Sequence, residues 1–365
     1  MPAKAESPGS LVRTILSRQL EALGFFAQGF LSARSFQAVL DEEEVSTQIR
    51  ERYGTDKSPS LAAVALNYSE GPDTLPAWAA EAAGAFPASL EPLLTVAHFA
   101  RANWYAEIDR RLAVAVRATR FEAAAKGIEI PGAKAWKRLV NSGLPEKALS
   151  LRAGLGWIGK NTILIASGSK GTSSAVLLGL LLCPIDLEPA EPAERRSVSL
   201  SLENSKAGEP GRGEGGLNGE QGCGNCRRCV QACPTGALGS QGYVLDRRSC
   251  IQHWTHIDEA APAKILPFLS GRLYGCDSCL EACPYFVPDQ KALCMQGILG
   301  KAIPARSLLA FSEAGLKTAL RGTALDRSWI SLKALRRNAA LSLETGRNEG
   351  ADSRRESKEN VPHDH

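Results

Sequence analysis

Cysteine spacing is the strongest chemical signal in this chain of 365 residues, which contains 10 cysteines. Two runs, each followed by a proline, carry seven of them: Cys223-x2-Cys226-x2-Cys229-x3-Cys233 and Cys276-x2-Cys279-x3-Cys283. Each [4Fe-4S] cubane takes four thiolates, and closely spaced cysteines let one loop supply three of them. The spacing therefore predicts two [4Fe-4S] clusters.

The pairing of these ligands follows from the ferredoxin pattern, in which the cysteine before the proline ligates the other cluster. The predicted ligands of the first cluster site are Cys223, Cys226, Cys229 and Cys283. Those of the second cluster site are Cys233, Cys276, Cys279 and, as the candidate for the missing fourth ligand, Cys250. Cys183 and Cys294 stay outside both sites, and Cys183 ends an apolar run as a small buried residue often does.

A zinc ribbon is the alternative reading of paired CxxC motifs, but seven cysteines in two runs exceed what one zinc needs. The longest apolar run, Ala175 to Cys183, is far shorter than the roughly 18 residues of a membrane span. With no visible signal peptide, we expect a cytoplasmic protein with reduced cysteines and no membrane partner. The composition is that of a globular protein, with 44% hydrophobic and 22% charged residues, and its net charge of +4 permits a nucleic-acid partner without requiring one.

A glycine motif, Gly154-x-Gly156-x-x-Gly159, matches the dinucleotide-binding pattern in letters only. That fold needs a strand before the glycines and a helix after them. Here a helix-like segment precedes them and the strand-like Thr162–Ala166 follows, so we reject NAD binding. The glycines with Lys160 and Asn161 indicate either a backbone cradle for another cofactor or a tight turn.

Several segments together resemble the epoxyqueuosine reductase family. They are AGLGWIGKNTILI, CGNCRRCVQACPTGAL, LDRRSCIQHWTHID and RLYGCDSCLEACPYF, with weaker likeness in VALNY, FARANWYAEIDRRL and LRRNAALSLETG. The cluster motifs are shared with many ferredoxins, whereas their combination with the glycine loop is specific. The likeness covers about residues 60 to 346, apart from 186–221.

The resemblance implies a cobalamin-dependent reductase that converts epoxyqueuosine to queuosine in tRNA, with cobalamin in the N-terminal domain beside the two clusters. It also assigns the cysteine of the Cys250 segment to the second cluster. The residues it places at the cofactor are Asn141, Gly156, Ile158, Gly159, Lys160, Asn161 and His253. An external electron donor, such as a flavodoxin or a ferredoxin, is expected.

The sequence departs from the family at the residues nearest the expected chemistry. The family's proton-donating aspartate is replaced by Asn141 in a segment that is one residue shorter, and a carboxamide is no acid near neutral pH. The family's histidine after Tyr105 is Ala106. Catalysis then uses another donor, namely Tyr105, Glu146 or a water held by Asn141, or else the chain is a paralogue with another substrate.

Basic residues beside the clusters and near the C-terminus are the candidates for tRNA phosphate contacts by analogy with the family. They are Arg227, Arg228, Arg247, Arg248, Lys333, Arg336 and Arg337. For each one, a solvated charged surface is the simpler interpretation. Trp157 and Trp254 are candidates for lining the corrin pocket, or they are ordinary core residues.

Hydrophobic periodicity gives the elements that must position these residues. It predicts helix over 11–45, a buried strand over 61–67, one or two helices over 90–126, and a short strand over 128–130. It also predicts a helix over 144–152, a strand over 162–166, a buried run over 173–182, and helix over 305–346.

These elements predict an α+β protein with five parts. An α/β cobalamin-binding domain spans 1–185, a mobile insertion 186–221, a ferredoxin-like double-cluster domain 222–300, a C-terminal helical-repeat segment 301–346, and a disordered tail 347–365. The rival class is a non-catalytic electron-transfer protein, which would have no need of so large an N-terminal domain.

Overall fold

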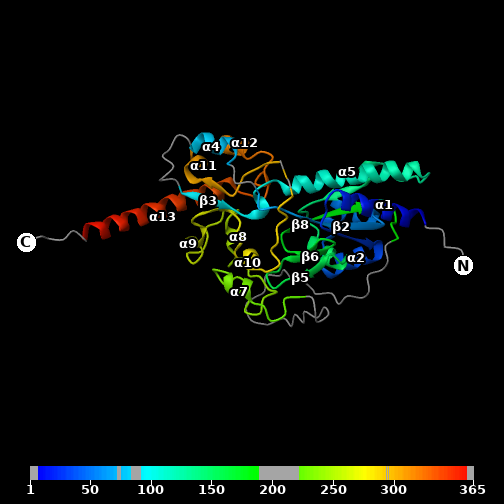
Figure 1. The fold of residues 1–365 in the computed structure, drawn as a ribbon, viewed down its shortest axis with the longest axis horizontal. Helices are drawn as coiled ribbons and strands as arrows, with labels where there is room; N and C mark the ends of the chain where they lie inside the picture. Colours follow the sequence, from blue (N-terminus) through cyan, green and yellow to red (C-terminus); the bar gives the residue numbers. More distant parts are fainter. Residues whose placement is uncertain are drawn as a thin grey trace, which may run out of the picture.

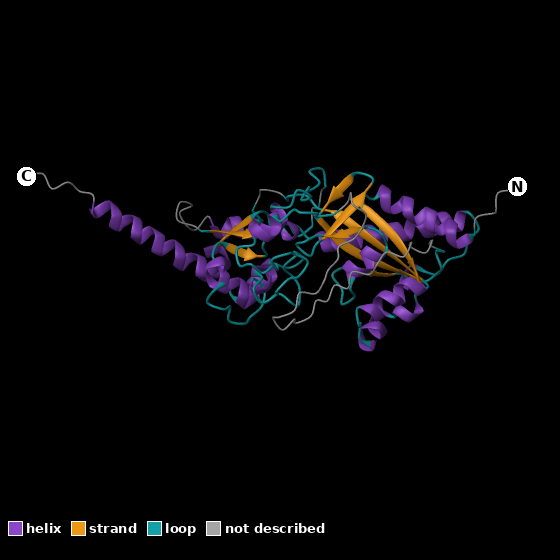
Figure 2. Cartoon of the chain, turned by 90° about the horizontal axis from the view of Figure 1, so that it is seen from below, coloured by secondary structure: helices purple, strands orange, loops and turns teal. Residues whose placement is uncertain are grey.

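The computed structural model describes residues 7–71, 75–83, 92–188, 222–292, 294 and 296–359 of the chain. Two lobes lie side by side, with the N-terminal helices and the largest sheet in one and the C-terminal helices in the other (Figure 1). The short cysteine-bearing helices lie between and below them in this view. Seen from below, the large sheet stands apart from the smaller one near the long C-terminal helix (Figure 2).

The large sheet has the strand order β1-β2-β8-β4, formed by Ala27–Ser32, Ser60–Asn67, Val176–Cys183 and Lys137–Leu139. All of its pairings are antiparallel. The expected layering of helix on strand is present, but antiparallel pairing makes this an α+β domain and not an α/β domain of parallel strands.

Helices cover both faces of this sheet. One face packs against α1 (Pro8–Ala22) and α5 (Trp104–Ala125), and the other against α2 (Ala33–Glu42) and α6 (Glu146–Arg152). Every residue of β2 is buried, because its side chains alternate between the two hydrophobic cores. Such a strand reads as a continuous apolar run, which is why the sequence predicts it well.

A glycine sets the distance between α5 and the sheet. A Cβ atom at Gly179 of β8 would lie 2.6 Å from Cγ2 of Ile108. The helix therefore packs closer to the sheet than any larger residue at this position allows.

Two predictions about the N-terminal lobe are wrong. The helix predicted over 11–45 is interrupted by β1, which pairs with β2 from Ala27 to Ser32. The predicted strand over 128–130 is irregular chain after α5. Tertiary pairing overrides local periodicity in both places, since a strand gains its hydrogen bonds only from a neighbour in the sheet.

The other predictions hold with shifted ends. The strand predicted over 162–166 is β6 (Leu164–Gly168), and it forms a small antiparallel sheet with β5 (Gly156–Ile158) and β7 (Gly171–Ser173). The buried run over 173–182 is a strand, β8. The exception is the range 90–126, predicted as one or two helices: the single long helix α5 begins at Trp104, whereas Leu93–Val96 form a strand and His98–Ala100 a 3₁₀ turn.

The second lobe is built on a sheet that combines distant parts of the chain. Its order is β10-β3-β9, with β3 (Leu93–Val96) between β10 (Ala302–Pro304) and β9 (Arg272–Tyr274). The predicted first domain, 1–185, therefore contributes a strand to the lobe that holds the C-terminal segment. Four helices surround this sheet: α4 (Ala77–Ala83), α11 (Ala305–Ala310), α12 (Glu313–Ala319) and α13 (Leu332–Glu359).

The remaining helices are short. They are α3 (Thr47–Tyr53), α7 (Arg228–Ala232), α8 (Ile251–Trp254), α9 (Leu266–Leu269) and α10 (Ser278–Glu281), with single 3₁₀ turns at Thr55–Lys57, His98–Ala100 and Ala133–Ala135. Those between 222 and 285 alternate with loops that present cysteines. Short helices suit this segment because every few residues a side chain must turn inward as a ligand.

The ends of the predicted parts differ from the structure in one place. Helix α13 continues to Glu359, across most of the segment 347–365 that we expected to be a disordered tail. Extending an existing helix costs far less than nucleating one, and Glu, Lys and Arg are good helix formers. The predicted insertion, 186–221, lies outside the described residues from 189 onward.

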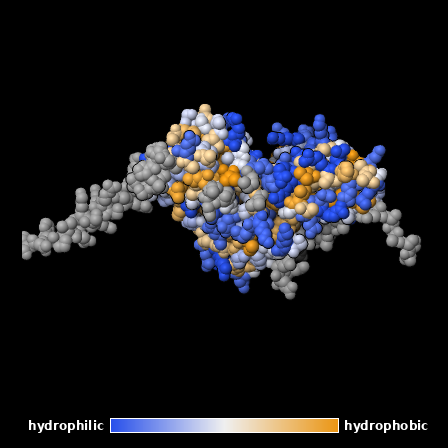
Figure 3. All heavy atoms as spheres, turned by 45° about the horizontal axis from the view of Figure 1, so that its top comes forward, coloured by the Kyte–Doolittle hydropathy of each residue, from blue (hydrophilic) through white to orange (hydrophobic). Residues whose placement is uncertain are grey.

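The molecular surface mixes hydrophilic and hydrophobic residues, and the two lobes are separated by an indentation along the top of the view in Figure 3. None of the helices in the described ranges is long and apolar enough to span a bilayer.

Candidate functional site

The structure gathers the eight predicted ligand cysteines into two neighbouring groups. Cys229 has Cys223, Cys226 and Cys283 as its charged neighbours, and Cys283 in turn is close to Cys223 and Cys226. In the second group, Cys279 lies close to Cys276, Cys250 and Cys233. The grouping is the one that the spacing predicts, including the exchange of Cys233 and Cys283 between the two runs.

Burial and the nearness of other thiols shift the pKa values of the cysteines in these groups. Burial raises the pKa of Cys279 to about 12, and the neighbouring thiolates of Cys276, Cys250 and Cys233 contribute to this rise. Burial opposes the ionisation of Cys233 as well, but its pKa is lowered overall by hydrogen bonds from the backbone and hydroxyl of Thr235 and from the backbone of Leu238 and Ala237. Crowded thiolates of this kind need cations between them to be stable in the folded protein.

The four thiols of the first group surround a cavity of about 100 Å³. Its wall is completed by Lys160, Asn161, Gly222, Arg228, Pro284 and Tyr285. Across the described residues, no three of these sulfur atoms lie within 4.8 Å of one another. Four sulfurs around one zinc ion are about 3.8 Å apart, since each Zn–S bond is about 2.3 Å. The spacing of the sulfur atoms in this structure is wider than a single zinc ion requires and is compatible with a cubane.

Local structure explains why the two runs meet. Helix α7, which contains Cys229 and ends just before Cys233, packs against α10, which contains Cys279 and ends shortly before Cys283. In each run a proline then directs the chain away from the helix, so the last cysteine faces the other group. After Cys283 the chain is fixed to the N-terminal lobe, because Ser174 N donates to Tyr285 O (2.7 Å) and Asn67 Nδ2 donates to Val287 O (3.0 Å).

The tip of the β5–β6 hairpin is hydrogen-bonded to the loop that carries the first group of thiols. Lys160 N donates to Cys223 Sγ over 3.4 Å, and Lys160 Nζ donates to the carbonyl oxygens of Gly224 (2.7 Å) and Cys226 (2.9 Å). Tyr243 N donates to Lys160 O over 2.9 Å. The sequence places Lys160 at cobalamin, whereas the structure directs its ammonium group to the cysteine loop.

Asn161, next along the hairpin, is only 4% exposed. Its Oδ1 accepts from Ile163 N (3.2 Å), while its Nδ2 is buried and has no hydrogen-bond partner. The residue lines the cavity between the four thiols. A buried amide N–H without a partner, on a residue that lines this cavity, is a candidate donor to a cluster sulfur.

The GxGxxG motif is part of this hairpin and not the start of a helix. Gly156 lies in β5, where a Cβ atom would come within 1.9 Å of Ile165 O, and Gly159 N donates to Ile163 O (2.9 Å) in the turn. Ile158 is buried between them. The glycines are thus required by the turn and the close strand approach, which agrees with the rejection of NAD binding.

Around the segment where the family's acid is expected, the structure offers a different carboxyl group. Asn141 is exposed and adopts a left-handed backbone with φ of 51°. Glu146, at the start of α6, accepts from Ser142 N (2.7 Å) and Ser142 Oγ (2.9 Å). Burial raises the pKa of Glu146 to about 7, in spite of these hydrogen bonds.

Tyr105, from the start of α5, interacts electrostatically with Glu146. Burial is the main cause that raises the Tyr105 pKa far above its usual range, so this phenol stays protonated. The guanidinium of Arg327 lies 5.3 Å from the centre of the Tyr105 ring. Tyr105 and Glu146, two candidate donors from the sequence, thus interact electrostatically, and the backbone N–H of Asn141 donates to the Glu146 carboxyl group.

The last predicted cofactor residue, His253, belongs to α8, three positions after Cys250. Its ring lies 5.1 Å from Trp254 and 6.0 Å from His256, centre to centre. Burial lowers its pKa, which keeps the imidazole neutral, and its Nδ1 is buried with no partner. The contacts found in the described chain do not join His253 to Asn141 or to the hairpin.

Comparisons with known proteins agree with this geometry. Residues 222–285 match the family described as "4Fe-4S double cluster binding domain". An epoxyqueuosine reductase of Listeria monocytogenes is 34% identical over 150 residues, which are 41% of this chain and 32% of that protein. The epoxyqueuosine reductase structure from Streptococcus thermophilus has a TM-score of 0.65 over 96% of this chain and 86% of that one, at 19% identity. This chain has the fold of an epoxyqueuosine reductase.

Another epoxyqueuosine reductase structure, which contains a tRNA-Tyr epoxyqueuosine-modified stem loop, has a TM-score of 0.63 and 22% identity. The alignment covers 93% of this chain and 82% of that one. By sequence, the similar region spans only about a third of the Listeria epoxyqueuosine reductase. The resemblance found in the motifs is thus matched by curated relatives and by the fold.

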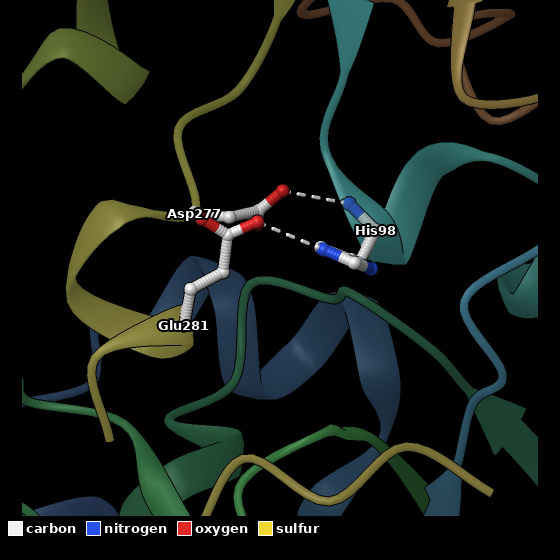
Figure 4. A group of neighbouring side chains, drawn as sticks. All are labelled: His98, Asp277 and Glu281. Atoms are coloured by element: carbon white, nitrogen blue, oxygen red, sulfur yellow. Dashed lines mark hydrogen bonds and ion pairs between the residues drawn. The ribbon is translucent and has the colours of Figure 1, made fainter.

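One side-chain group that sequence reasoning missed lies beside the second thiol group. His98 N donates to Asp277 Oδ2 (2.9 Å), and His98 Nε2 lies 3.1 Å from Glu281 Oε1, as Figure 4 shows. Three potential ligand atoms here lie within 4.8 Å of one another, and one hydrogen bond joins the imidazole to Glu281, while Asp277 accepts from the His98 backbone. The group joins the 3₁₀ turn after β3 to α10, so it locks the cysteine segment onto the chain that precedes α5. Sequence offers no signal for it, because nearly 180 residues separate its members.

The basic residues proposed for tRNA fall into two sets. Arg228, Arg247 and Arg248 are exposed, and so are Arg227, which donates to Ser240 O, and Lys333, which pairs with Asp258. Near the C-terminus, the side chains are engaged within the protein: Arg336 donates to Phe311 O (2.6 Å), and Arg337 donates to Glu259 O (2.9 Å). The exposed set is better placed for phosphate contacts.

Proposed function

We propose that this protein is a cobalamin-dependent iron–sulfur reductase that converts epoxyqueuosine to queuosine in tRNA in the cytoplasm. One observation carries the proposal: two groups of four thiols lie on an epoxyqueuosine reductase fold, and the Lys160 hairpin joins the first group, which surrounds a cavity, to the large N-terminal lobe. A simple electron-transfer protein has no use for such a lobe.

The cluster ligands in this proposal are the two groups of thiols described above. The first cluster site takes Cys223, Cys226, Cys229 and Cys283, and the second takes Cys233, Cys250, Cys276 and Cys279. Support comes from the thiol contacts and from the double-cluster family match. When bound, the clusters supply electrons one at a time.

The overall reaction removes one oxygen atom as water. Two C–O bonds of the epoxide break, a C=C bond forms, and the balance requires two electrons and two protons. A ferredoxin- or flavodoxin-class protein is the proposed electron donor, and the two clusters relay each electron toward the N-terminal lobe. The chain itself must position the nucleoside and deliver protons.

Cobalamin is the proposed second cofactor, and when bound it supplies strongly reducing cobalt chemistry. Two buried nitrogen donors without partners, Trp157 Nε1 and His253 Nδ1, suit the amide carbonyls at the edge of a corrin. With them, Asn141, Gly156, Ile158 and Gly159 are the residues proposed to face this cofactor. Lys160 and Asn161 are assigned instead to the first cluster site.

Glu146 is the proposed proton donor in place of the family's aspartate. Its carboxyl group is held by Ser142, lies near the phenol of Tyr105, and has a pKa of about 7. A group with that pKa is protonated often enough, and acidic enough, for general acid catalysis at neutral pH. Asn141 can hold a water or an epoxide oxygen as a hydrogen-bond donor, but it cannot supply the proton.

The proposed substrate is bound through phosphate contacts from exposed arginines near the clusters. Arg228, Arg247 and Arg248 are the candidates, since each is exposed and lies close to a cysteine ligand in sequence. The epoxyqueuosine reductase solved with a tRNA stem loop supports RNA as the class of partner.

A second candidate is a paralogue with the same cofactors and another substrate. The specific observation in its favour is the pair of replacements nearest the chemistry, Asn141 and Ala106. The two candidates differ in one measurable product, the queuosine of cellular tRNA.

Nucleoside analysis of tRNA from a deletion strain tests the proposal. We expect epoxyqueuosine to accumulate in place of queuosine, and queuosine to return when the gene is restored. Unchanged queuosine in a strain with no other enzyme for this step would refute the tRNA substrate. Corrinoid absorbance bands after reconstitution separate both candidates from an electron-transfer protein, which would bind no cobalamin.

A further inference from the structure

The hairpin tip formed by Lys160 and Asn161 brings hydrogen-bond donors from the N-terminal lobe to the first cluster site. The backbone N–H of Lys160 points at Cys223 Sγ, and its ammonium group is fixed 2.7 Å and 2.9 Å from two carbonyls of the cysteine loop. This places a positive charge within the loop that wraps the cluster. No comparable hairpin contact reaches Cys250, Cys276 or Cys279 in the hydrogen bonds of the described residues.

Asn161 adds a second donor from the same turn. The residue lines the cavity with Cys223, Cys226 and Cys283, and its Nδ2 is buried and has no hydrogen-bond partner in the described part of the chain. Its Oδ1 is fixed by Ile163 N, which holds the amide plane. The only acceptors that a cluster brings into this cavity are its sulfurs, so an N–H···S bond satisfies the free N–H group.

Tyr243 completes the surroundings of Cys223. Its hydroxyl bonds to the Cys223 thiol, while its backbone N–H donates to Lys160 O. Lys160, Asn161 and Tyr243 therefore form one connected unit around a single corner of the first cluster site.

Donors and a cation stabilise the reduced state of a cluster more than the oxidised state, because reduction adds one negative charge. They raise the reduction potential, as hydrogen bonds to cluster sulfurs do generally. We propose that Lys160 and Asn161 set the reduction potential of the first cluster site and make it the higher of the two. They act as positioning residues at the point where electrons pass from the cluster segment to the N-terminal lobe.

The inference deepens the proposed function but depends only on the clusters in it. A redox titration of the clusters needs neither tRNA nor cobalamin. Loss of the tRNA activity would therefore leave this inference standing, and a failed titration would leave the substrate question open.

The test is an EPR-monitored potentiometric titration of the anaerobically reconstituted full chain. Lys160→Met removes the ammonium group but keeps the length of the stem and the backbone N–H. At the midpoint potential of the wild-type first cluster, we expect the ratio of reduced to oxidised cluster in this variant to fall about tenfold. For a one-electron couple, this corresponds to a midpoint potential about 59 mV lower. The second cluster is an internal reference whose ratio stays constant. Lys160→Arg, which retains the charge, should recover most of the loss.

Two further variants complete the test. Lys170→Met removes an exposed lysine from the turn before β7 of the same small sheet, and it should shift neither potential. Asn161→Asp replaces the N–H donor by an anion and should shift the first cluster further than Lys160→Met. If Asn161→Asp loses iron, the titrations of Lys160→Met and Lys160→Arg still decide the matter. Unchanged potentials in Lys160→Met, or equal shifts of both clusters, would overturn the inference.

Discussion

Replacing Glu146 by glutamine separates the proposed role of this side chain as a proton donor from its structural role as a hydrogen-bond acceptor. The glutamine side chain keeps an oxygen that can accept the two hydrogen bonds from Ser142, which are 2.7 Å and 2.9 Å long in the wild-type protein. It has no proton to give at neutral pH. Because α6 begins at this residue, a variant that preserves the bonds should preserve the start of the helix.

The size of the effect follows from the pKa. At pH 7 a carboxyl group with an ordinary pKa of 4.5 is about 0.3% protonated, whereas one with a pKa of about 7 is about half protonated. Burial thus increases the acid form roughly 150-fold. General acid catalysis contributes about 10²- to 10⁴-fold to a rate, so we expect kcat of Glu146→Gln to fall at least about 100-fold.

The same pKa gives a stability signature that does not depend on activity. The folded state of Glu146 holds its proton up to about pH 7, while the unfolded chain loses it near 4.5. Between these pH values the folded state binds more protons, so the free energy of unfolding falls as pH rises. At pH 8 the loss reaches up to about 3 kcal/mol, and Glu146→Gln should recover it, while at pH 4 the substitution should change little.

The assay is single-turnover reduction of epoxyqueuosine-tRNA from pH 5.5 to 9, together with urea unfolding at pH 4 and pH 8. The wild-type rate should fall as pH rises through about 7, and this dependence should vanish in Glu146→Gln. Glu129→Gln, at an exposed carboxylate, is the matched control and should change neither measurement. A Glu146→Gln enzyme that retains both the rate and its pH dependence would show that the proton comes from elsewhere.

Three further predictions concern the clusters, the proton-donor segment and the fold. Cys279→Ala should lower the iron and sulfide content of anaerobically purified protein to about half, because one cluster is lost. The control variant Cys294→Ala should retain about eight iron atoms. Equal iron contents in the two variants would contradict the ligand sets. Asn141→Asp restores the family's carboxylate and should retain activity at neutral pH, measured in the same single-turnover assay; complete inactivation with cobalamin still bound would mean that Asn141 does not align with that carboxylate. Gly179→Ala should lower the free energy of unfolding by about 1–3 kcal/mol, because its Cβ would overlap a side chain of α5, while Gly132→Ala, with open space around it, should be neutral in the same urea titration.

The cysteine chemistry could be predicted in detail from the sequence. The spacing of Cys223, Cys226 and Cys229 fixes three corners of one cubane, and the proline after Cys233 fixes the direction of the fourth. Such a motif is local, and its geometry is dictated by the ligand itself. The structure accordingly brings Cys283 to the first group and Cys233 to the second.

Elements whose stability depends on distant partners were predicted less well. Residues Ala27 to Ser32 carry a helical pattern but pair with β2, and Leu93 to Val96 leave the first predicted domain to pair with β9 and β10. Hydrophobic periodicity registers only near neighbours, whereas strand pairing depends on residues that can be about 200 positions away. Fully buried β2 was found because burial on both faces leaves an apolar run in the sequence.

The amino-acid sequence by itself was enough to predict two iron–sulfur clusters, since the thiol spacing and the prolines that direct ligation are local features, and the double-cluster family match agrees. Only the tertiary structure decided what surrounds those clusters. There the Lys160 ammonium group contacts the cysteine loop, the buried Nδ2 of Asn161 has no partner, and Glu146 interacts electrostatically with Tyr105. Burial and long-range hydrogen bonding set potentials and pKa values, and neither is defined until the two lobes pack together.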